Sequence, residues 1–325
     1  MSGSPIPERW WSMSKSVLVA YAMVPLLFIL SMVMIPGFGS WPSIVSLLVI
    51  ASFLGIASIG QTLTVLLGGI DLSIPAIIGL ANVLTVRWYG AGIPFPLVVL
   101  MVIAVSMAIG ATSGILSRVL NAHPLLVTLA ASFMILGAVL VYTEGQTIGT
   151  VPDYLMAAVS PAGRTGPIPF PPIVVVWFAL TLLVVAIEQR SLLGRYLFAT
   201  GANERSARLA LVPVTLVWAA TFAVSAGCAA IAGILLAGFS GGADANVGQP
   251  YLFQTVAAVV VGGTALLGGS GSYGRTFAGT LLITELTTFL IGLGFSERIQ
   301  QMMLGLLIIL LVALYGRESH VRSQI

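Results

Sequence analysis

The sequence predicts an all-α integral membrane protein with about ten transmembrane helices, some of them broken at glycine. Residues of the set AVILMFWYC make up 58% of the 325 residues, and charged residues only 7%. A typical soluble domain has about 25% charged residues. The apolar runs follow one another without a polar domain between them, so we expect a single transmembrane domain. The net charge of +3 comes from arginines in loops and requires no nucleic-acid partner.

Ten apolar runs are long enough to cross about 30 Å of hydrocarbon at about 1.5 Å per helical residue. They lie near residues 17–36, 43–67, 72–89, 95–117, 124–142, 170–187, 213–238, 251–267, 276–293 and 299–315. The first run is too long for the apolar part of a signal peptide, and further spans follow it directly. We therefore expect a transmembrane domain over residues 17–315, with 1–16 and 316–325 as tails.

Basic residues indicate the orientation, because short cytoplasmic loops are enriched in lysine and arginine. They cluster at both ends of the chain and after the fourth and sixth spans. The clusters contain Arg9, Lys15, Arg118, His123, Arg190, Arg195, Arg205, Arg208, Arg317 and Arg322. With ten spans, every cluster falls on one side, and Arg87 and Arg164 are the exceptions. Both termini and the loop 188–212 are therefore expected in the cytoplasm, and the loop 143–169 on the opposite side of the membrane.

Residues 57–80 contain the most informative break in an apolar run. A membrane-type helix is interrupted at Gly68-Gly69 and resumes after Asp71. Backbone groups that such a break frees inside a membrane must find partners within the protein. We expect Ser73 to be the N-cap of the resumed helix. Asp71 then either bonds the freed N–H groups or a neighbouring helix, or it contacts a transported substrate.

A similar pattern recurs in the second half of the chain. The sequence Val-Leu-Leu-Gly-Gly at 65–69 is echoed by Val-Val-Val-Gly-Gly at 259–263. The pattern predicts a second helix break at Gly262 and Gly263. Gly68 and Gly262 are 194 residues apart, and five spans in each half would make the repeat inverted in the membrane, as in many transporters.

Two long loops separate the spans. Loop 143–169 is either a docking surface for an extracytoplasmic partner or a passive linker. In the loop 188–212, residues 203–211 predict a short amphipathic helix with Asn203 as its cap and with Leu209 and Leu211 facing inward. The side chains expected to stay in solvent are Glu204, Arg205 and Arg208. This helix either lies on the lipid surface or is held by a cytoplasmic partner.

No catalytic, metal or cofactor site is expected on this chain. His123 and His320 both lie outside the predicted spans, and no His, Cys and Asp grouping has metal-binding spacing. Residues 263–270 fit the phosphate-loop pattern except that Gly269 occupies the position of the essential lysine. Energy from ATP would therefore have to come from another chain.

Polar residues inside the predicted spans are few, and four of them are candidates for lining a substrate pathway. These are Gln61, Asp71, Asn82 and Glu285. Glu285 lies in the middle of a span and must therefore pair, line water or be protonated. Serine and threonine side chains in the spans are expected to hold helices together instead.

Several motifs spread over nearly the whole chain belong together. They are Gly60-x-Thr62, Gly68-Gly69-Ile70-Asp71-Leu72-Ser73, Pro124-x-x-Val127-Thr128-Leu129, Gly145-Gln146, Gly194-Arg195, Ala199-Thr200-Gly201-x-Asn203-Glu204, Ala207-Arg208-Leu209 and Gly262-Gly263-Thr264 with Gly268-Gly269-x-Gly271-Ser272. In these motifs the sequence resembles the permease subunits of the ribose/xylose/arabinose-type bacterial ABC sugar importers.

The resemblance implies a multi-pass protein of the bacterial inner membrane with the fold of vitamin B12-type ABC importer permeases. It implies a second permease copy or a paralogous permease, a periplasmic sugar-binding protein, and a cytoplasmic ABC ATPase that carries ATP and Mg. The residues it places at the ATPase interface are Gly201, Asn203, Glu204, Arg205, Arg208 and Leu209. Leu211 departs from the family, which commonly has glycine there.

The sequence thus predicts a permease subunit of an ATP-driven importer for a small sugar or polyol. The alternative is a secondary transporter driven by an ion or proton gradient, with Asp71 and Glu285 as carrier carboxylates. That alternative gives the arginine-rich cytoplasmic loop no function. A membrane-embedded enzyme is a more distant alternative, because the sequence shows no pair of nucleophile and base.

Overall fold

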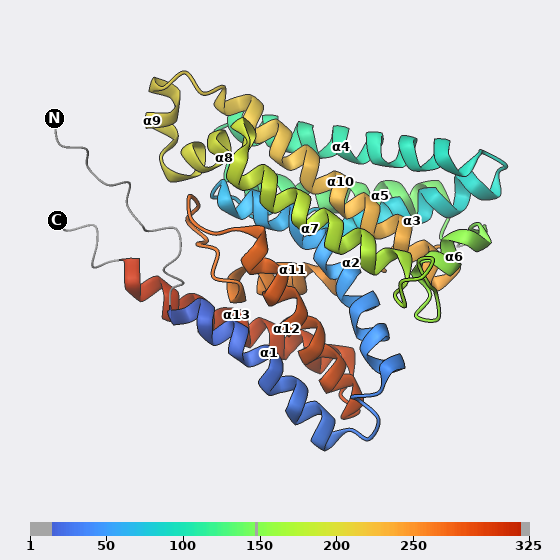
Figure 1. The fold of residues 1–325 in the computed structure, drawn as a ribbon. Coiled ribbons are helices and arrows are strands. Elements are labelled where there is room, and N and C mark those ends of the chain that lie inside the picture. Colours follow the sequence, from blue (N-terminus) through green and yellow to red (C-terminus); the bar gives the residue numbers. More distant parts are fainter. Residues whose placement is uncertain (1–14, 147–148, 320–325) are drawn as a thin grey trace.

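The computed structural model describes residues 15–146 and 149–319, and within them the chain forms thirteen α-helices and no strand (Figure 1). The helices are α1 (Lys15–Met34), α2 (Trp41–Leu66), α3 (Ile74–Gly90), α4 (Phe95–Val119), α5 (Pro124–Thr143), α6 (Asp153–Val159), α7 (Pro172–Arg190), α8 (Leu192–Ala202), α9 (Glu204–Leu209), α10 (Val214–Ser240), α11 (Tyr251–Val261), α12 (Tyr273–Gly292) and α13 (Glu297–Ser319). Predictions for residues 1–14, 147–148 and 320–325, which include Arg9, His320 and Arg322, lie outside the described residues.

The all-helical membrane class is confirmed. Each of the ten predicted apolar runs contains one helix, and the short helices α6, α8 and α9 lie in the two long loops. By length and composition, α2, α4, α5, α7 and α10 are able to cross a membrane, and two shorter apolar helices cover Tyr21–Met34 and Tyr251–Val261. The count of ten spans goes beyond this and stays a prediction.

Helix α10 lies at the centre of the bundle and packs against α2, α3 and α4 (Figure 1). Glycines allow the close approach, as expected where lipid supplies no hydrophobic drive between helices. A Cβ added at Gly110 of α4 would lie 2.2 Å from the carbonyl oxygen of Phe222, and one at Gly233 of α10 would lie 2.3 Å from that of Ile78. In the apolar stretches of α2 and α10, 67% of the residues are buried, against 22% in the apolar stretch of α4.

The helices connect two ends of the molecule. Helices α8 and α9, the last turn of α2 and the loop from α11 to α12 lie at one end, and α6 lies at the other (Figure 1). We call these the α9 end and the α6 end. Helix α1 begins and α13 finishes on the side of the α9 end, and α1 packs along α12. The described part of the chain therefore begins and ends on the side of the arginine-rich loop.

Residues 241–250 are not a helical part of a span. After α10 ends, this segment returns along α3, where the N–H of Asp244 donates to Oδ1 of Asn82 at 2.8 Å. An added Cβ at Gly79 would lie 2.0 Å from the carbonyl oxygen of Ala245. The helix in the predicted span 251–267 is shorter than expected, because α11 ends at Val261.

The described part of the loop 143–169 is packed rather than extended. Its helix α6 buries Leu155 and Val159, and an added Cβ at Gly238 of α10 would lie 2.6 Å from Cγ of Leu155. Val151, which precedes α6, is also buried. This segment therefore forms an ordered cover at the α6 end of α3 and α10.

Candidate functional site

Helix α2 ends in a glycine turn that reverses the chain. Gly68 has a φ of +89°, a left-handed conformation that glycine adopts without strain. The N–H of Gly69 donates to the carbonyl of Thr64, and the N–H of Gly68 donates to that of Val65, both at 2.9 Å. This pair of hydrogen bonds closes a helix end at glycine. The break thus lies at the predicted position.

The second break has the same geometry. Gly263 has a φ of +77°, its N–H donates to Val260 at 2.9 Å, and the N–H of Thr264 donates to Val259 at 3.2 Å. The conformations therefore match between Gly68 and Gly263, a separation of 195 residues rather than the predicted 194. Gly262 instead occupies the helical C-cap position of α11.

The prediction that these two breaks are inverted relative to each other in the membrane is wrong. The N–H of Gly269, in the loop after α11, donates to the carbonyl of Leu66 at the end of α2 at 2.8 Å. Both helices therefore end at the α9 end of the molecule (Figure 1). Breaks that were related by an inverted repeat would lie toward opposite ends.

Asp71 ties the first break to the central helix. Its side chain is buried, with 2% exposure. Oδ1 accepts the N–H and the hydroxyl of Ser73 at 2.9 and 2.6 Å, and Oδ2 accepts the hydroxyl of Ser225 on α10 at 2.7 Å. The N–H of Leu72 donates to the hydroxyl oxygen of Thr128 on α5 at 3.0 Å. Side chains from two other helices thus satisfy this part of the break.

The capping role of Ser73 differs from the prediction. Ser73 does occupy the N-cap position of α3, but its side chain accepts no hydrogen bond from the first turn. Its hydroxyl donates to Asp71 instead. The carboxylate therefore takes the capping role that the sequence assigned to the serine, because it reaches both the Ser73 N–H and α10.

Gln61 lies beside the Asp71 anchor. An added Cβ at the preceding Gly60 would lie 2.5 Å from Cα of Ser225, so this turn of α2 packs directly on α10. The Gln61 side chain is fully buried, and neither Oε1 nor Nε2 has a hydrogen-bond partner. An unpaired buried polar group costs about 1–3 kcal/mol, so this amide is available to a water molecule or a solute.

Asn82 is engaged in the fold. Besides accepting the N–H of Asp244, it donates through Nδ2 to the carbonyl of Gly233 at 3.5 Å. The side chain is fully buried. Asn82 therefore holds the returning segment 241–250 against α3 and α10.

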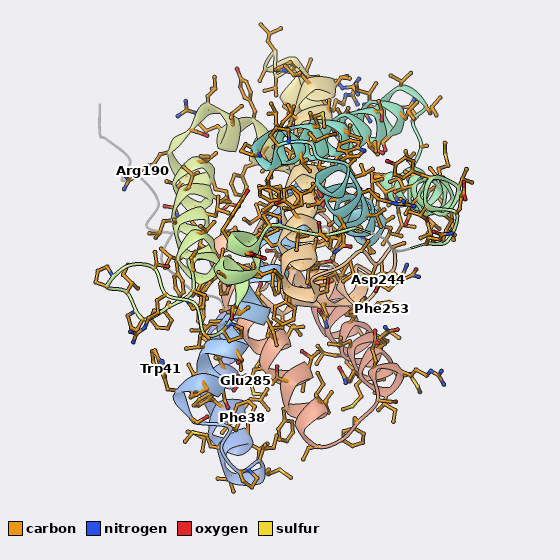
Figure 2. The ribbon with its side chains drawn as sticks, turned by 90° about the vertical axis from the view of Figure 1, so that its right-hand side faces the viewer. Phe38, Trp41, Arg190, Asp244, Phe253 and Glu285 are labelled. Carbon is orange, nitrogen blue, oxygen red and sulfur yellow. The ribbon has the colours of Figure 1, made fainter. Side chains whose placement is uncertain are left out.

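Glu285 is not brought together with the other three candidates. Its helix α12 packs against α1, α2 and α11. Figure 2 shows Glu285 well separated from Asp244, the residue held by Asn82. Glu285 therefore does not lie beside the Asn82 site.

The fold leaves the Glu285 carboxyl unsatisfied. The Glu285 side chain has 2% exposure, and neither of its oxygens has a hydrogen-bond partner. Ser31 of α1 is also fully buried and its hydroxyl has no partner. Both polar groups are therefore buried without a partner.

The loop 188–212 is held against the helix bundle by a helix cap and ion pairs. Asn203 caps α9 by accepting the N–H of Ser206 at 2.9 Å. Glu204 pairs with Arg118 at the end of α4 and with Arg208, each at 2.5 Å. The Arg118 guanidinium also lies 5.9 Å from the ring centroid of Trp218 on α10. Partial burial raises the pKa of the Glu204 carboxyl, and the two guanidinium groups oppose that shift because they favour the ionised form.

The prediction that Leu209 and Leu211 face inward is wrong. Their side chains are 81% and 90% exposed, and Ala207 is the buried residue of α9. Helix α9 ends at Leu209, and Leu211 adopts a left-handed φ of +61° that follows from the turn into α10. Arg205 and Arg208 are exposed, as predicted, whereas Glu204 is partly buried.

Gly201 is partly buried and packs against the end of α2. A Cβ added to it would lie 1.9 Å from the carbonyl oxygen of Leu66. The last turn of α8 therefore touches the end of α2 directly. The exposed surface of this segment includes Leu192 and Leu193 of α8 as well as α9 and the turn after it.

Sequence reasoning missed a third buried carboxylate, besides Asp71 and Glu285. Glu188, near the end of α7, accepts the N–H of Tyr273, the first residue of α12, at 3.1 and 3.0 Å. The Tyr273 hydroxyl donates to the carbonyl of Gly55 at 2.8 Å and accepts from Nε1 of Trp177 at 2.9 Å. The signal in the sequence was a lone acid at the end of an apolar run, which names no partner.

The acids of this chain are dispersed. Asp71, Glu188 and Glu204 each bond a different set of neighbours, and Glu285 stands alone. Among the residues that the structure describes, no group of three or more His, Cys, Asp or Glu side chains could hold a metal ion. The arrangement therefore positions helices and one free amide, and it presents an exposed apolar pair at the α9 end.

The comparisons with known proteins agree with one another over most of the chain. A family model described as "Branched-chain amino acid transport system / permease component" matches residues 43–312. The ribose import permease protein RbsC of Haemophilus influenzae is 30% identical over 295 residues, which cover 90% of each chain. RbsC of Bacillus subtilis is 31% identical over 297 residues, covering 90% of this chain and 91% of the relative.

A third relative, the galactofuranose transporter permease protein YtfT of Escherichia coli, is 30% identical over 262 residues. Here the alignment covers 80% of this chain and 75% of the relative. No solved structure matches the chain. The likeness thus rests on sequence and extends over most of its length.

Proposed function

Because this chain belongs to the branched-chain amino acid transport system permease family, and within it to the permeases of ABC sugar importers, we propose that it moves a small sugar or polyol inward across the inner membrane with energy from a separate ATPase. The resemblance that the sequence motifs carried is thereby confirmed. The observation that supports the energy source is the surface at the α9 end.

That surface suits a protein partner. Leu209 and Leu211 are almost fully exposed beside the exposed Arg205 and Arg208. Exposed apolar side chains with arginine are typical of interfaces. The Asn203 cap and the Glu204 pair with Arg118 fix the segment, so little conformational entropy remains to be lost on binding. The partner in this proposal is a cytoplasmic ABC ATPase carrying ATP and Mg.

An ATPase bound at the α9 end would set the orientation of the chain in the membrane, and the remaining parts of the proposal follow from that orientation. The α9 end faces the cytoplasm with both termini, the chain crosses the membrane ten times, and the α6 end receives solute from a periplasmic binding protein. The exposed apolar faces of α4, α5 and α13 contact lipid or a second permease, either an identical copy or a paralogue. The fold is that of the vitamin B12-type ABC importer permeases.

For the solute, Gln61 is the best contact among the four candidates. Its amide offers two donors and an acceptor without protein partners, whereas Asp71 and Asn82 are occupied by the fold. A neutral amide suits the hydroxyl groups of a sugar. The relatives include permeases named for ribose and galactofuranose, so we propose a small sugar or polyol as the class.

The test is purification of the chain from its native membrane in mild detergent. We expect an ABC ATPase to co-purify with the wild type and with Ile168→Glu, a matched charge introduced at an exposed apolar residue of the loop 143–169. Leu209→Glu should lose the ATPase while still inserting into the membrane. An ATPase-free protein that takes up solute only with an ion gradient would instead support a secondary transporter.

A further inference from the structure

Three backbone segments meet at the α9 end without side chains between them. They are the last turn of α8 at Gly201, the end of α2 at Leu66, and the loop after α11 at Gly269. An added Cβ at Gly201 would lie 1.9 Å from the carbonyl oxygen of Leu66 and 3.0 Å from the amide nitrogen of Gly269. The N–H of Gly269 donates to the same Leu66 carbonyl at 2.8 Å. We call this the glycine junction.

Gly268 extends the junction. A Cβ added there would lie 2.9 Å from both the carbonyl oxygen of Gly201 and the amide nitrogen of Gly68. Both helix breaks are therefore joined to each other and to α8 through main-chain atoms. Backbone atoms cannot yield by changing a rotamer, so close-packed contacts of this kind transmit displacement.

The far side of the junction is the proposed ATPase surface. Helix α8 continues into α9 through Asn203, which ends α8 and caps α9. Glu204 then fixes α9 to Arg118 of α4. A displacement of α9 is therefore carried into Gly201 within one turn of helix.

We propose that Gly201 is a positioning residue that transmits movement of α8 and α9 to both glycine breaks at once. This inference rests on the proposed function, because it assumes an ATPase that moves α9. It assigns Gly201 to the internal linkage and leaves contact with the ATPase to α9 and the turn after it. Only glycine fits the position, since any Cβ separates α8 from Leu66.

The central experiment compares Gly201→Ala with Gly137→Ala in the assembled complex. A Cβ at Gly137 of α5 would meet no atom within 4 Å, so it controls for the exchange of glycine in a membrane helix. Uptake into proteoliposomes, ATP hydrolysis and the melting temperature are measured for each variant. We expect Gly201→Ala to bind the ATPase and hydrolyse ATP while uptake is lost, and Gly137→Ala to behave as the wild type.

A variant in which uptake and hydrolysis stay coupled as in the wild type would overturn the linkage, and so would an equal loss of both with normal assembly. If Gly201→Ala fails to assemble, hydrogen exchange of the wild-type complex decides. ATP binding should change exchange at residues 199–203 together with the Gly269 amide. A change at 199–203 that leaves Gly269 unchanged refutes the proposal. Failure of the wild type to bind any ATPase would instead refute the proposed function.

Discussion

The first prediction concerns Asp71, whose carboxylate holds the first break by three hydrogen bonds. Asp71→Ala leaves the N–H and hydroxyl of Ser73 and the hydroxyl of Ser225 buried without this acceptor. A buried donor left without an acceptor costs about 1–3 kcal/mol, so we expect the loss of an acceptor for three donors to lower the free energy of unfolding by at least about 3 kcal/mol. Asp71→Asn keeps an acceptor oxygen for Ser73 and should cost about 1 kcal/mol.

The share of the bond to α10 can be measured separately. Ser225→Ala should cost about 0.6 kcal/mol if the bond is an ordinary interhelical one, but about 1.5–3 kcal/mol if it is made to an ionised carboxylate. Unfolding in detergent micelles measures each variant and the double variant, whose coupling energy isolates the pair. Thr85→Ala on α3 is the control, because its buried hydroxyl bonds only the carbonyl of Ala81.

The result that would refute the reasoning is specific. If Asp71→Ala and the wild type differ by less than about 1 kcal/mol, which is no more than one ordinary hydrogen bond contributes, Asp71 does not hold the break. A large loss without coupling to Ser225 would place the effect in the turn alone. Either outcome would also remove the reason for excluding Asp71 as a solute contact.

Three further predictions test other parts of the structure. Leu211→Gly should stabilise the turn after α9 by about 0.5–1 kcal/mol, because relief of left-handed strain exceeds the entropy cost of glycine; slower proteolysis at 209–213 measures it, and Leu209→Gly should do the opposite. Glu285→Leu should raise the free energy of unfolding by about 1–3 kcal/mol, since the carboxyl is buried without a partner; a lower melting temperature would show that the buried acid stabilises the fold. Glu188→Ala should lower the free energy of unfolding by about 1–3 kcal/mol by leaving the Tyr273 N–H unpaired, whereas Glu188→Gln should lose less; equal losses would mean that charge, not the acceptor, matters.

Helix positions could be predicted from the sequence because each depends only on the length of an apolar run. The faces could not. Helices α5 and α10 are apolar on every side, so no periodicity indicates which side meets protein. On α12, an added Cβ at Gly292 would lie 2.4 Å from Cδ1 of Ile35, and one at Gly274 would lie 3.4 Å from Cγ2 of Val185 on α7. Nothing in the sequence marks these two glycines as contacts of different segments.

The error at Leu209 and Leu211 has a related cause. An amphipathic pattern predicts burial only where another surface covers the apolar face. Helix α9 has six residues, and its cover comes from the side of Arg118 and Trp218, which reaches only Ala207. The two leucines remain exposed, and that exposure is the strongest support for a partner at this end.

The left-handed glycines of the two breaks are 195 residues apart rather than the predicted 194, because a sequence pattern does not give the backbone conformation of each residue. Leu67 and Gly262 both occupy a C-cap with helical φ, which any residue can adopt. Glycine at 262 is needed for a different reason, since an added Cβ would lie 2.8 Å from the carbonyl oxygen of Arg275. The left-handed conformation belongs to Gly68 and Gly263. The Gly-Gly pair therefore meets different structural requirements in the two halves of the chain.

The positions of the junction and of Asp71 together limit how the first break can move. Leu66 is joined to Gly201 and Gly269 on one side of the turn, and Asp71 is joined to Ser225 on the other. Gly60 packs on the same Ser225, so the body of α2 and the start of α3 share one anchor on α10. A displacement delivered at Leu66 must then be absorbed between the junction and this anchor, in residues 61–66 of α2 and in residues 67–70. Gln61 lies at the anchored end of that stretch with its amide free, so the residue best suited to contact solute adjoins the segment that the junction would move.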